Sequence, residues 1–363
     1  MEKGIQTTVI TGHNESAYRN ENVEGIDVHY LPVTYKNSFG FTARSSAFLK
    51  YIIHVINKNS IIRDADVCYA ISVPLTVGLA ALWIKFRYKI PFIFEVGDLW
   101  PEAPIQMGVI KNPLLKGLLF SLEKTIYQHA LSVVALSPAI QQAIQKKTPG
   151  KMVHLIPNMA DVDFYKPGEK NTTLETKFNV SGKFVVSYVG ALGVANGLDY
   201  FLECARASQK LEMPIHFLLC GDGAMKKNLE QSALRLQLQN LSFLDFQNRS
   251  GVSEVMNVTD AVFISYKSVP VLETGSPNKY FDGLAAGKMI VINFSGWIKE
   301  EIEKQECGIY LDSKHPTDFV KKITPFLSDA TRHKYQAKAR ELAIQKYSRK
   351  TLGEKFVAIV QAQ

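Results

Sequence analysis

Long apolar runs are scarce in this sequence, which limits how the chain can meet a membrane. One of its longer apolar stretches, Val73 to Ile84, has only twelve residues, whereas a membrane-spanning helix needs about twenty. The first residues, Met1 to Gly4, contain no apolar core of the kind found in signal peptides. We therefore predict a cytoplasmic protein that meets the inner face of the plasma membrane only peripherally.

Cysteine is also scarce, and its four copies are scattered through the chain. None forms a Cys-x-x-Cys pair or a cluster with histidine, so we expect neither a zinc site nor a disulfide framework. No Asp-x-Asp pair stands at the end of an expected strand, and no Ser-His-Asp or Cys-His arrangement is evident. These absences predict a site that works without a metal ion or another cofactor.

Acidic residues are outnumbered by basic ones, 34 to 42, which gives a formal net charge of +8 and an isoelectric point near 9.1. A basic balance favours nucleic acid, anionic lipid or phosphorylated substrates as partners. No nucleic-acid-binding motif accompanies the charge. We therefore predict no nucleic-acid partner and favour phosphorylated substrates and an anionic membrane surface.

Strand and helix patterns alternate along most of the chain, as is typical of α/β folds with parallel sheets. The polar linker Lys166 to Lys183 divides the pattern into two Rossmann-like halves, so we expect domains at residues 1–165 and 166–340. A long terminal helix from about Thr331 supplies a last segment, 341–363. Two such halves predict a ligand site in a cleft between them, at the carboxyl ends of the strands. The expected strands are Gln6–Thr11, Gly25–Val33, Asp66–Ala70, Phe92–Glu95, Ser132–Leu136, Met152–Ile156, Phe184–Val189, Ile215–Cys220, Leu241–Phe243, Ala261–Ile264, Met289–Ile292 and Gly308–Leu311.

The stretch from Ser276 to Lys288 carries the strongest functional pattern. Pro277 favours the opening of a short helix, which Gly287 ends. Lys279 falls in the first turn, where the helix dipole disfavours a cation, so a bound phosphate is one reason for its position. Asp282, one turn further, is placed to accept hydrogen bonds from sugar hydroxyls. The alternative is a capped surface helix with a solvated lysine and aspartate.

Two glycine-rich turns follow strands of the second half. The first contains Gly190, Gly193 and Asn196, and its backbone N–H groups suit a pyrophosphate. The second contains Gly221 and Asp222 and is also explained by a tight strand-to-helix turn. The first turn has no cation of its own, so Lys279 and then Arg249 are the candidates to neutralise phosphate, although Arg249 is equally explained as a solvated loop residue.

Polar side chains also follow strands of the first half. Asp98, Trp100 and Glu102 lie just after the strand Phe92–Glu95, where carboxylates suit a polar site and an indole can stack on a sugar. Capping of a helix by Asp98 is the alternative. Ser72 ends another strand and is placed either to cap a helix or to touch an acceptor.

These motifs resemble those of one known family. Ser276-Pro277-Asn278-Lys279, Phe281-Asp282-Gly283-Leu284-Ala285-Ala286-Gly287-Lys288 and Asp98-Leu99-Trp100-Pro101-Glu102 are similar to signatures of the family 4 retaining glycosyltransferases of GT-B fold. The similar branch is the bacterial surface-polysaccharide one that contains the L-fucosamine transferases. The resemblance implies that Glu273, Lys279 and Asp98 are catalytic. It implies an acceptor side formed by Ser72, Asp98, Trp100 and Glu102, and a donor site formed by Gly190, Gly193, Asn196, Gly221, Asp222, Arg249, Lys279, Asp282 and Leu284.

The resemblance also implies an activity. It is the transfer, with retention, of an N-acetyl amino sugar from a UDP-sugar to a lipid-linked or saccharide acceptor in polysaccharide biosynthesis. Two alternatives stay open. One is a sugar-nucleotide 2-epimerase of the same fold, against which the Trp100 signature argues. The other is a catalytically impaired relative that serves as a binding or scaffold subunit.

The expected helix Leu114–His129 adds a link to membranes. Leu114, Leu115, Leu118, Leu119 and Leu122 form an apolar stripe with lysines beside it. Apolar and basic faces together suit a helix that lies in a membrane interface. A core helix with one solvated edge is the alternative.

The start of the chain departs from the β-α rhythm found elsewhere. Lys3-Gly4 resembles the end of a helix, and the strands Gln6–Thr11 and Gly25–Val33 follow with only a loop between them. In the resembled family an earlier strand would be central in a sheet of order 3-2-1-4-5. We therefore expect either that Met1 is not the true start or that the chain is a truncated, weakly active or inactive relative.

Overall fold

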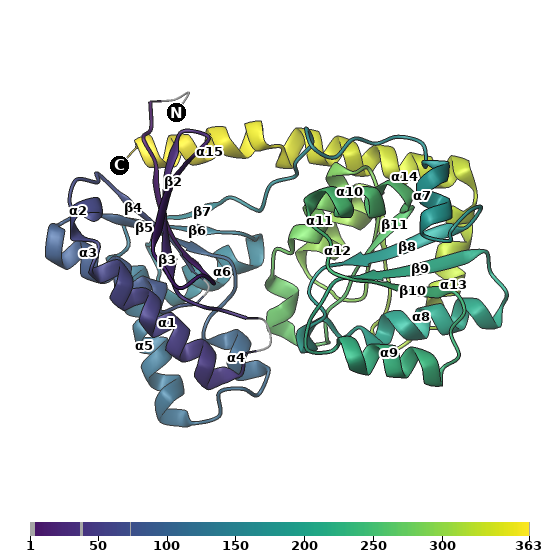
Figure 1. The fold of residues 1–363 in the computed structure, drawn as a ribbon, viewed down its shortest axis with the longest axis horizontal. Coiled ribbons are helices and arrows are strands. Elements are labelled where there is room, and N and C mark those ends of the chain that lie inside the picture. Colours follow the sequence, from purple (N-terminus) through teal and green to yellow (C-terminus); the bar gives the residue numbers. More distant parts are fainter. Residues whose placement is uncertain (1–3, 37–38, 73, 363) are drawn as a thin grey trace. The chain divides into compact units, whose positions relative to one another are not determined.

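The computed structural model describes residues 4–36, 39–72 and 74–362 (Figure 1). The chain forms two compact units, of which unit 1 contains Met1–Ile156 and Lys355–Gln363 and unit 2 contains Pro157–Glu354. The division therefore falls somewhat before the expected boundary at residue 165. Both units are Rossmann-like, with helices and mostly parallel strands in alternation.

Unit 2 is built on one parallel sheet with the strand order β10-β9-β8-β11-β12-β13. The chain enters at the central strand β8, moves outward to β10 and returns to β11, which is the order of dinucleotide-binding sheets. The order reverses between β8 and β11, and in such sheets ligands bind outside the carboxyl ends of the strands at that point. The strands are β8 (Phe184–Val189), β9 (Ile215–Cys220), β10 (Leu241–Leu244), β11 (Ala261–Ile264), β12 (Met289–Ile292) and β13 (Gly308–Tyr310).

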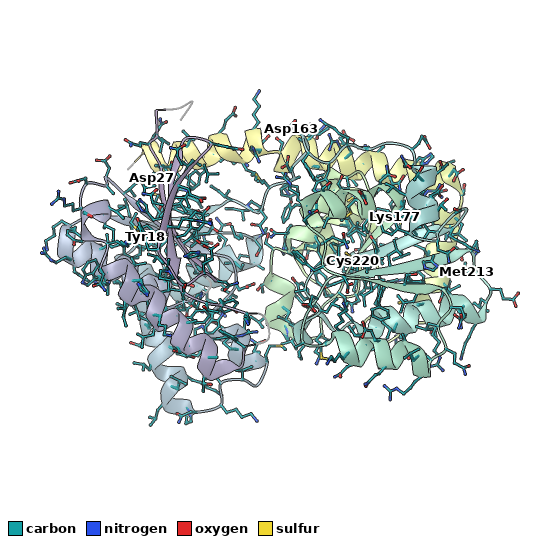
Figure 2. The ribbon with its side chains drawn as sticks, in the orientation of Figure 1. Tyr18, Asp27, Asp163, Lys177, Met213 and Cys220 are labelled. Carbon is teal, nitrogen blue, oxygen red and sulfur yellow. The ribbon has the colours of Figure 1, made fainter. Side chains whose placement is uncertain are left out.

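The expected strands of unit 2 are confirmed, four of them at both ends. They are nearly continuous apolar runs because a parallel sheet is covered on both faces. Val186 and Tyr188 face one helical layer, and Val185 faces the other. Cys220, near the centre of unit 2 in Figure 2, is 1% exposed and belongs to the second layer.

Helices cover both faces of this sheet (Figure 1). The layer with Tyr188 contains α8 and α13, and the opposite layer contains α7 and α10. The helical segments of unit 2 are α7 (Thr172–Lys177), η1 (Val194–Asn196), α8 (Asp199–Lys210), α9 (Lys226–Arg235), α10 (Arg249–Val258), η2 (Pro270–Thr274), α11 (Asn278–Ala285), α12 (Trp297–Lys304), α13 (Asp318–Ile323), η3 (Thr324–Leu327), α14 (Asp329–Leu342), the π-helical η4 (Ala343–Tyr347) and the first part of α15 (Arg349–Gln361).

The terminal helix is interrupted, which corrects the expectation of one continuous helix. The chain turns at Ser348, whose ψ of 152° is extended. The N–H of Ala160 donates to the Tyr347 carbonyl at 2.7 Å, and Ala160 forms a parallel bridge with Ser348. Tertiary pairing therefore replaces helical hydrogen bonds at this point. The residues from Lys355 onward belong to unit 1, where Phe356 packs edge-on against Tyr69 at 4.9 Å.

Unit 1 has two sheets among its described residues, one with the order β1-β3-β2 and a parallel one with the order β4-β5-β6-β7. The strands are β1 (Thr8–His13), β2 (Arg19–Val23), β3 (Ile26–Pro32), β4 (Cys68–Ser72), β5 (Phe92–Val96), β6 (Ser132–Ala135) and β7 (Val153–Leu155). The helices are α1 (Phe41–Ile56), α2 (Asn59–Ile62), α3 (Val77–Tyr88), α4 (Glu102–Gln106), α5 (Pro113–His129) and α6 (Pro138–Lys147).

The start of unit 1 differs from the expected pair of strands joined by a loop. That loop contains β2, which pairs antiparallel with β3, while β1 pairs parallel with β3. The residues of β2 are mostly polar, so the sequence pattern does not indicate a strand there. In the structure, β2 and β3 nevertheless form an antiparallel hairpin. Within the described part of the chain, β1 pairs only with β3 and β4 only with β5. Lys3, where a helix end was expected, lies outside the described residues.

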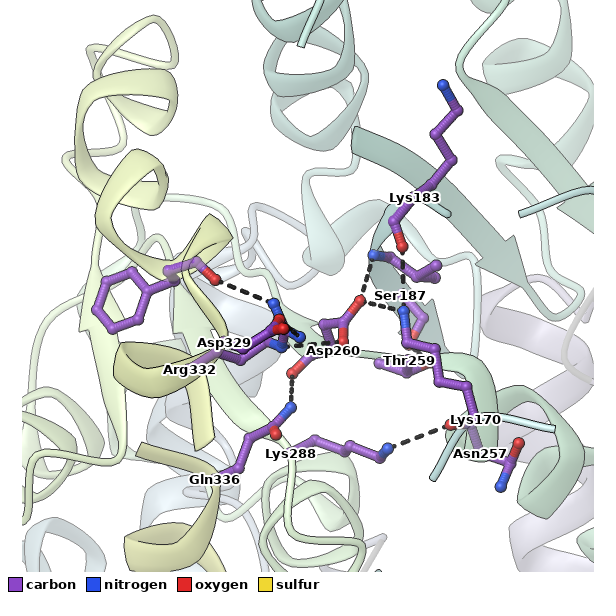
Figure 3. A network of polar contacts seen from close by, with 12 residues as sticks. Lys170, Lys183, Ser187, Asn257, Thr259, Asp260, Lys288, Asp329, Arg332 and Gln336 are labelled. Carbon is purple, nitrogen blue, oxygen red and sulfur yellow. Dashed lines mark hydrogen bonds and ion pairs between the residues drawn. The ribbon is translucent and has the colours of Figure 1, made fainter. Parts of the chain in front are cut away.

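A buried carboxylate joins several elements at the amino ends of the strands of unit 2 (Figure 3). Asp260, which is 3% exposed, accepts a hydrogen bond from the Val185 N–H at 2.7 Å. It forms ion pairs with Lys170 of the linker and with Nε of Arg332 on α14, the latter at 3.3 Å. One carboxylate therefore connects the linker, β8 and the terminal helices.

Lys288 belongs to the same network and is 7% exposed. Its ammonium donates to the Asn257 carbonyl at 3.3 Å, and burial lowers its pKa to about 8. Lys288 and Asp260 line a pocket of about 940 Å³ at the amino ends of the strands. Gly190 lies at the opposite, carboxyl end of β8, so this pocket is distinct from the site predicted from sequence.

Candidate active site

The two glycine turns of unit 2 pack backbone against backbone. The Gly190 N–H donates to the Cys220 carbonyl at 2.9 Å. A Cβ at Gly221, whose φ is +147°, would overlap the Gly190 carbonyl oxygen. A Cβ at Gly223 would lie 2.6 Å from the Leu192 carbonyl oxygen. The turns after β8 and β9 therefore need these glycines for close approach.

The hydrogen bonds of the first turn change which N–H groups are available to a ligand. The N–H groups of Gly190 and Leu192 donate to backbone carbonyls, and that of Gly193 donates to Oδ1 of Asn196 at 3.2 Å. Among the described residues, no partner accepts from the N–H groups of Ala191, Val194 and Ala195. The N–H groups that this turn offers to a ligand are therefore those of residues beside Gly190 and Gly193, not those of the two glycines themselves.

The polar side chains of these turns have local partners. Asn196 closes the turn through its bond with Gly193. Asp222 is exposed and accepts from the Gly223 N–H at 2.8 Å. It does not cap α9, which begins four residues later. Turn formation alone accounts for the positions of both side chains.

Lys279 lies beside the first turn. Its Nζ is 4.7 Å from the centre of the Tyr188 ring, and Nζ and Cε are the atoms closest to a Cβ built on Gly190. Burial lowers the pKa of Lys279 to about 8, against an opposing effect of Asp282. No carboxylate or carbonyl of the described residues forms an ion pair or hydrogen bond with this ammonium. It is a half-buried cation held by an aromatic face, next to free backbone N–H groups.

Asp282 faces the same side of α11 as Lys279. Burial raises the pKa of Asp282 to about 6, while Arg249 and Lys279 act in the opposite direction. The side chain of Leu284, in contrast, is completely buried. Its side chain is therefore not accessible to a donor, and a role in donor binding stays a prediction for its backbone alone.

Arg249 has a partner that the sequence did not indicate. Its guanidinium forms an ion pair with Asp161 and lies 4.0 Å from the centre of the Phe164 ring. Asp161 also accepts from the Phe164 N–H at 3.1 Å. Arg249 is thus held by unit 2 itself and is not a free cation.

Glu273 lies in the short turn η2. Its carbonyl oxygen lies 2.7 Å from the position of a Cβ at Gly296, whose φ is +100°, so the backbone of Glu273 is closely packed. Its carboxylate is half-buried and has no ion pair or hydrogen bond to any described residue. It is available to a ligand at the carboxyl edge of the sheet.

In unit 1, the segment after β5 carries Asp98 and Trp100. Asp98 is exposed and caps no helix, because α4 begins after Pro101 without a side-chain cap. The peptide bond between Trp100 and Pro101 is cis. Ser72 is 3% exposed at the end of β4 and does not cap α3. Asp98 and Trp100 are accessible, whereas Ser72 is not.

Glu102 forms an ion pair within unit 1. Its carboxylate pairs with Lys147, whose Nζ also donates to Glu123 at 2.7 and 2.9 Å. Glu123 is 1% exposed and accepts from the Tyr127 hydroxyl at 2.9 Å. Burial raises the pKa of Glu123 to about 7, and Lys147 opposes that shift. This network explains the position of Glu102 without an acceptor.

The apolar stripe of α5 is largely exposed in its first half. Leu114 is 83% exposed and Leu118 is 66% exposed, and only Glu123, Ile126 and Tyr127 of this helix are buried. The alternative of a core helix therefore holds for the second half alone. No helix of the described residues is long and apolar enough to cross a membrane. The described residues also contain no group of three His, Cys, Asp or Glu side chains that could hold a metal ion.

Comparison with known families covers most of the chain. Residues 170–342 match the family described as glycosyl transferases group 1, and residues 1–159 match the glycosyl transferase 4-like domain. Each half of the chain is therefore similar to a glycosyltransferase family. Unit 2 thus corresponds largely to the group 1 match and unit 1 to the 4-like match.

Two curated relatives are similar over part of the chain. The Bacillus subtilis teichuronic acid biosynthesis glycosyltransferase TuaH is 26% identical over 255 residues, which are 69% of this chain and 62% of that protein. The Salmonella typhimurium lipopolysaccharide 1,2-N-acetylglucosaminetransferase is 20% identical over 239 residues, or 62% of this chain and 60% of that protein. The chain therefore spans about three fifths of the length of these relatives.

Solved structures support the GT-B fold. Sucrose-phosphate synthase from Thermosynechococcus elongatus has a TM-score of 0.78 at 12% identity, covering 100% of this chain and 91% of that one. Anabaena Alr3699/HepE in complex with UDP-glucose has a TM-score of 0.73 at 15% identity, covering 99% of this chain and 100% of that one. Both similarities concern the fold.

Proposed function

We propose that the protein transfers an N-acetyl amino sugar from a UDP-sugar to a lipid-linked saccharide, with retention at the anomeric carbon. The observation that carries the proposal is the Lys279 ammonium, which has no acceptor among the described residues. It lies beside Gly190 at the carboxyl end of β8, where the strand order reverses and dinucleotides bind in such sheets.

In this proposal unit 2 binds the donor. Lys279 and the free N–H groups of Ala191 and Val194 neutralise the diphosphate, and Asp282 accepts hydrogen bonds from the ribose. During transfer, the bond between C1 and the β-phosphate oxygen breaks and a bond from the acceptor hydroxyl oxygen to C1 forms on the same face. The hydroxyl proton passes to the departing β-phosphate oxygen on that face, and Lys279 stabilises the negative charge that develops on UDP. The half-buried carboxylate of Glu273 contacts the donor sugar.

The comparisons support the choice of donor and pathway. The HepE structure contains UDP-glucose, one relative is named for teichuronic acid biosynthesis and another for transfer of N-acetylglucosamine. The names of the two curated relatives, which refer to teichuronic acid and lipopolysaccharide, support a role in polysaccharide assembly. The donor site needs no metal ion in this proposal, because the lysine and the backbone donors supply the positive charge.

Unit 1 contributes the acceptor side and the membrane contact in this proposal. Asp98 and Trp100 are accessible after β5, where a carboxylate and an indole suit a saccharide. The exposed Leu114 and Leu118 of α5, with Lys111 and Lys124 nearby, suit a peripheral contact with an anionic membrane. Such a contact would bring the protein to a lipid-linked acceptor on the cytoplasmic face.

Calorimetric titration with UDP and with UDP-N-acetylglucosamine tests the donor site. Lys279→Ala should weaken binding by about 1.5–3 kcal/mol, the range for a hydrogen bond to a charged group. Lys226→Ala is the matched control, because Lys226 is also a cation near a carboxyl strand end but is already paired with Asp245. Equal affinities of the wild type and Lys279→Ala would contradict the proposal. Interconversion of UDP-sugars without an acceptor would favour an epimerase.

A further inference from the structure

One face of helix α11 contacts the carboxylate of Glu301, which has no role in the proposed transfer step. Glu301, on α12, has a side chain that is 10% exposed. Its Oε2 accepts the hydroxyls of Tyr280 at 2.6 Å and of Tyr347 at 2.5 Å, and its Oε1 forms an ion pair with Lys346. One carboxylate thus joins α11, α12 and η4.

The two tyrosines lie in a closed aromatic cluster. Tyr280 is fully buried and Tyr347 is 1% exposed. Tyr280 packs edge-on against Trp297 at 5.7 Å, and Phe281 packs edge-on against Tyr347 at 5.0 Å. The indole N–H of Trp297 donates to the Gly275 carbonyl at 2.9 Å. The cluster therefore fixes α11 and the loop that leads into it.

The geometry of α11 connects this cluster to the donor site. Successive residues of a helix are turned by about 100°, because 3.6 residues make one turn. Tyr280 and Phe281 therefore project from the face opposite to that of Lys279 and Asp282. Any rotation of α11 that relaxes the Tyr280–Glu301 hydrogen bond also moves the Lys279 ammonium relative to Gly190.

We propose that Glu301 is a positioning residue for the donor site, which it controls through Tyr280 and helix α11. Tyr347 on the same carboxylate makes the turn at η4 part of this support, so that the chain leaving unit 2 and the donor helix are fixed together. The inference rests on the proposed function for the identity of the ligand. The rigid support of α11 itself does not depend on any ligand.

Binding of UDP to three variants, well below their unfolding temperatures, tests the role of Glu301. Glu301→Gln and Tyr280→Phe should weaken UDP binding by about 2- to 30-fold, the range for mutations that act through a packed network. Tyr127→Phe is the matched control, because it removes another buried tyrosine–glutamate hydrogen bond, in unit 1. It should lower stability similarly and leave UDP affinity unchanged.

A double-mutant cycle separates positioning from general destabilisation. If Glu301 acts by placing Lys279, Glu301→Gln should have little further effect on UDP affinity in a Lys279→Ala background. Additive losses would overturn the proposal, as would unchanged UDP affinity in both Glu301→Gln and Tyr280→Phe.

A second measurement is independent of the ligand. Amide hydrogen exchange of α11 should accelerate in Glu301→Gln but not in Tyr127→Phe, and unchanged exchange would overturn the proposal. Failure of the wild type to bind UDP, with faster exchange in Glu301→Gln, would contradict the proposed function and support the role of Glu301 in holding α11.

Discussion

The carbonyl oxygen of Gly190 occupies the space that a side chain at Gly221 would need. The two residues directly follow the neighbouring strands β8 and β9, and Lys279 lies beside the turn that contains Gly190. This contact requires glycine for two reasons, since the φ of Gly221 is also in the left-handed range, at +147°.

Gly221→Ala should therefore lower the free energy of unfolding by at least about 1–3 kcal/mol, the cost of one strained backbone position, and should weaken UDP binding. Chemical denaturation and UDP titration measure the two effects. Gly117→Ala is the control, because Gly117 lies in α5 with open space around it. That change should instead stabilise the protein by roughly 0.5–1 kcal/mol. Equal stability of the Gly221→Ala variant and the wild type would show that the two turns are not packed as described.

UDP-sugar affinity should depend on pH with two limits. Asp282 is ionised above its pKa of about 6 and Lys279 is charged below its pKa of about 8, so binding should be strongest between these values. Titrations from pH 5 to 9 measure the profile. Asp282→Asn should remove the acid limit and Lys279→Met the alkaline one. A profile that stays unchanged in both variants would exclude these residues as its cause.

Lys147→Met should destabilise unit 1, because it leaves Glu123 buried beside Glu102 without a cation. Breaking a buried ion pair costs about 3–5 kcal/mol, and the lower end is expected since the Lys147 side chain is 27% exposed. Thermal unfolding measures this loss. Glu102→Gln, which keeps the Lys147–Glu123 pair, should cost less, and the reverse order would contradict the network.

Association with vesicles should depend on the first half of α5. Leu114→Ser combined with Leu118→Ser should abolish flotation with anionic vesicles and leave the unfolding temperature unchanged, because both side chains are mostly exposed. Leu234→Ser is the control, since Leu234 is 77% exposed on α9 of unit 2. No flotation of the wild type at low salt, or equal flotation of all variants, would contradict a membrane role for this helix.

The sequence by itself determined the fold class and most of the elements of unit 2. Buried parallel strands such as Phe184–Val189 are apolar along their whole length, and the glycine that ends α11 needs a left-handed conformation, with a φ of +62° for Gly287. Both signals are local, so they can be recognised in the sequence without knowledge of the segments that pack against these elements. The same is true of Lys279 and Asp282, which are three residues apart and must share a helix face.

Only the tertiary structure decided which polar groups are free. Arg249 and Asp161 are 88 residues apart, so no local pattern in the sequence connects them. The free N–H groups beside Gly190 depend on hydrogen bonds with the turn after β9, and the burial of the Leu284 side chain depends on the elements that pack around α11. The role of Glu301 could not be predicted from the sequence either, because its partners Tyr280 and Tyr347 lie in other segments of the chain. The position of a charge in a sequence fixes its helix face, but its partners depend on distant segments that meet only in the fold.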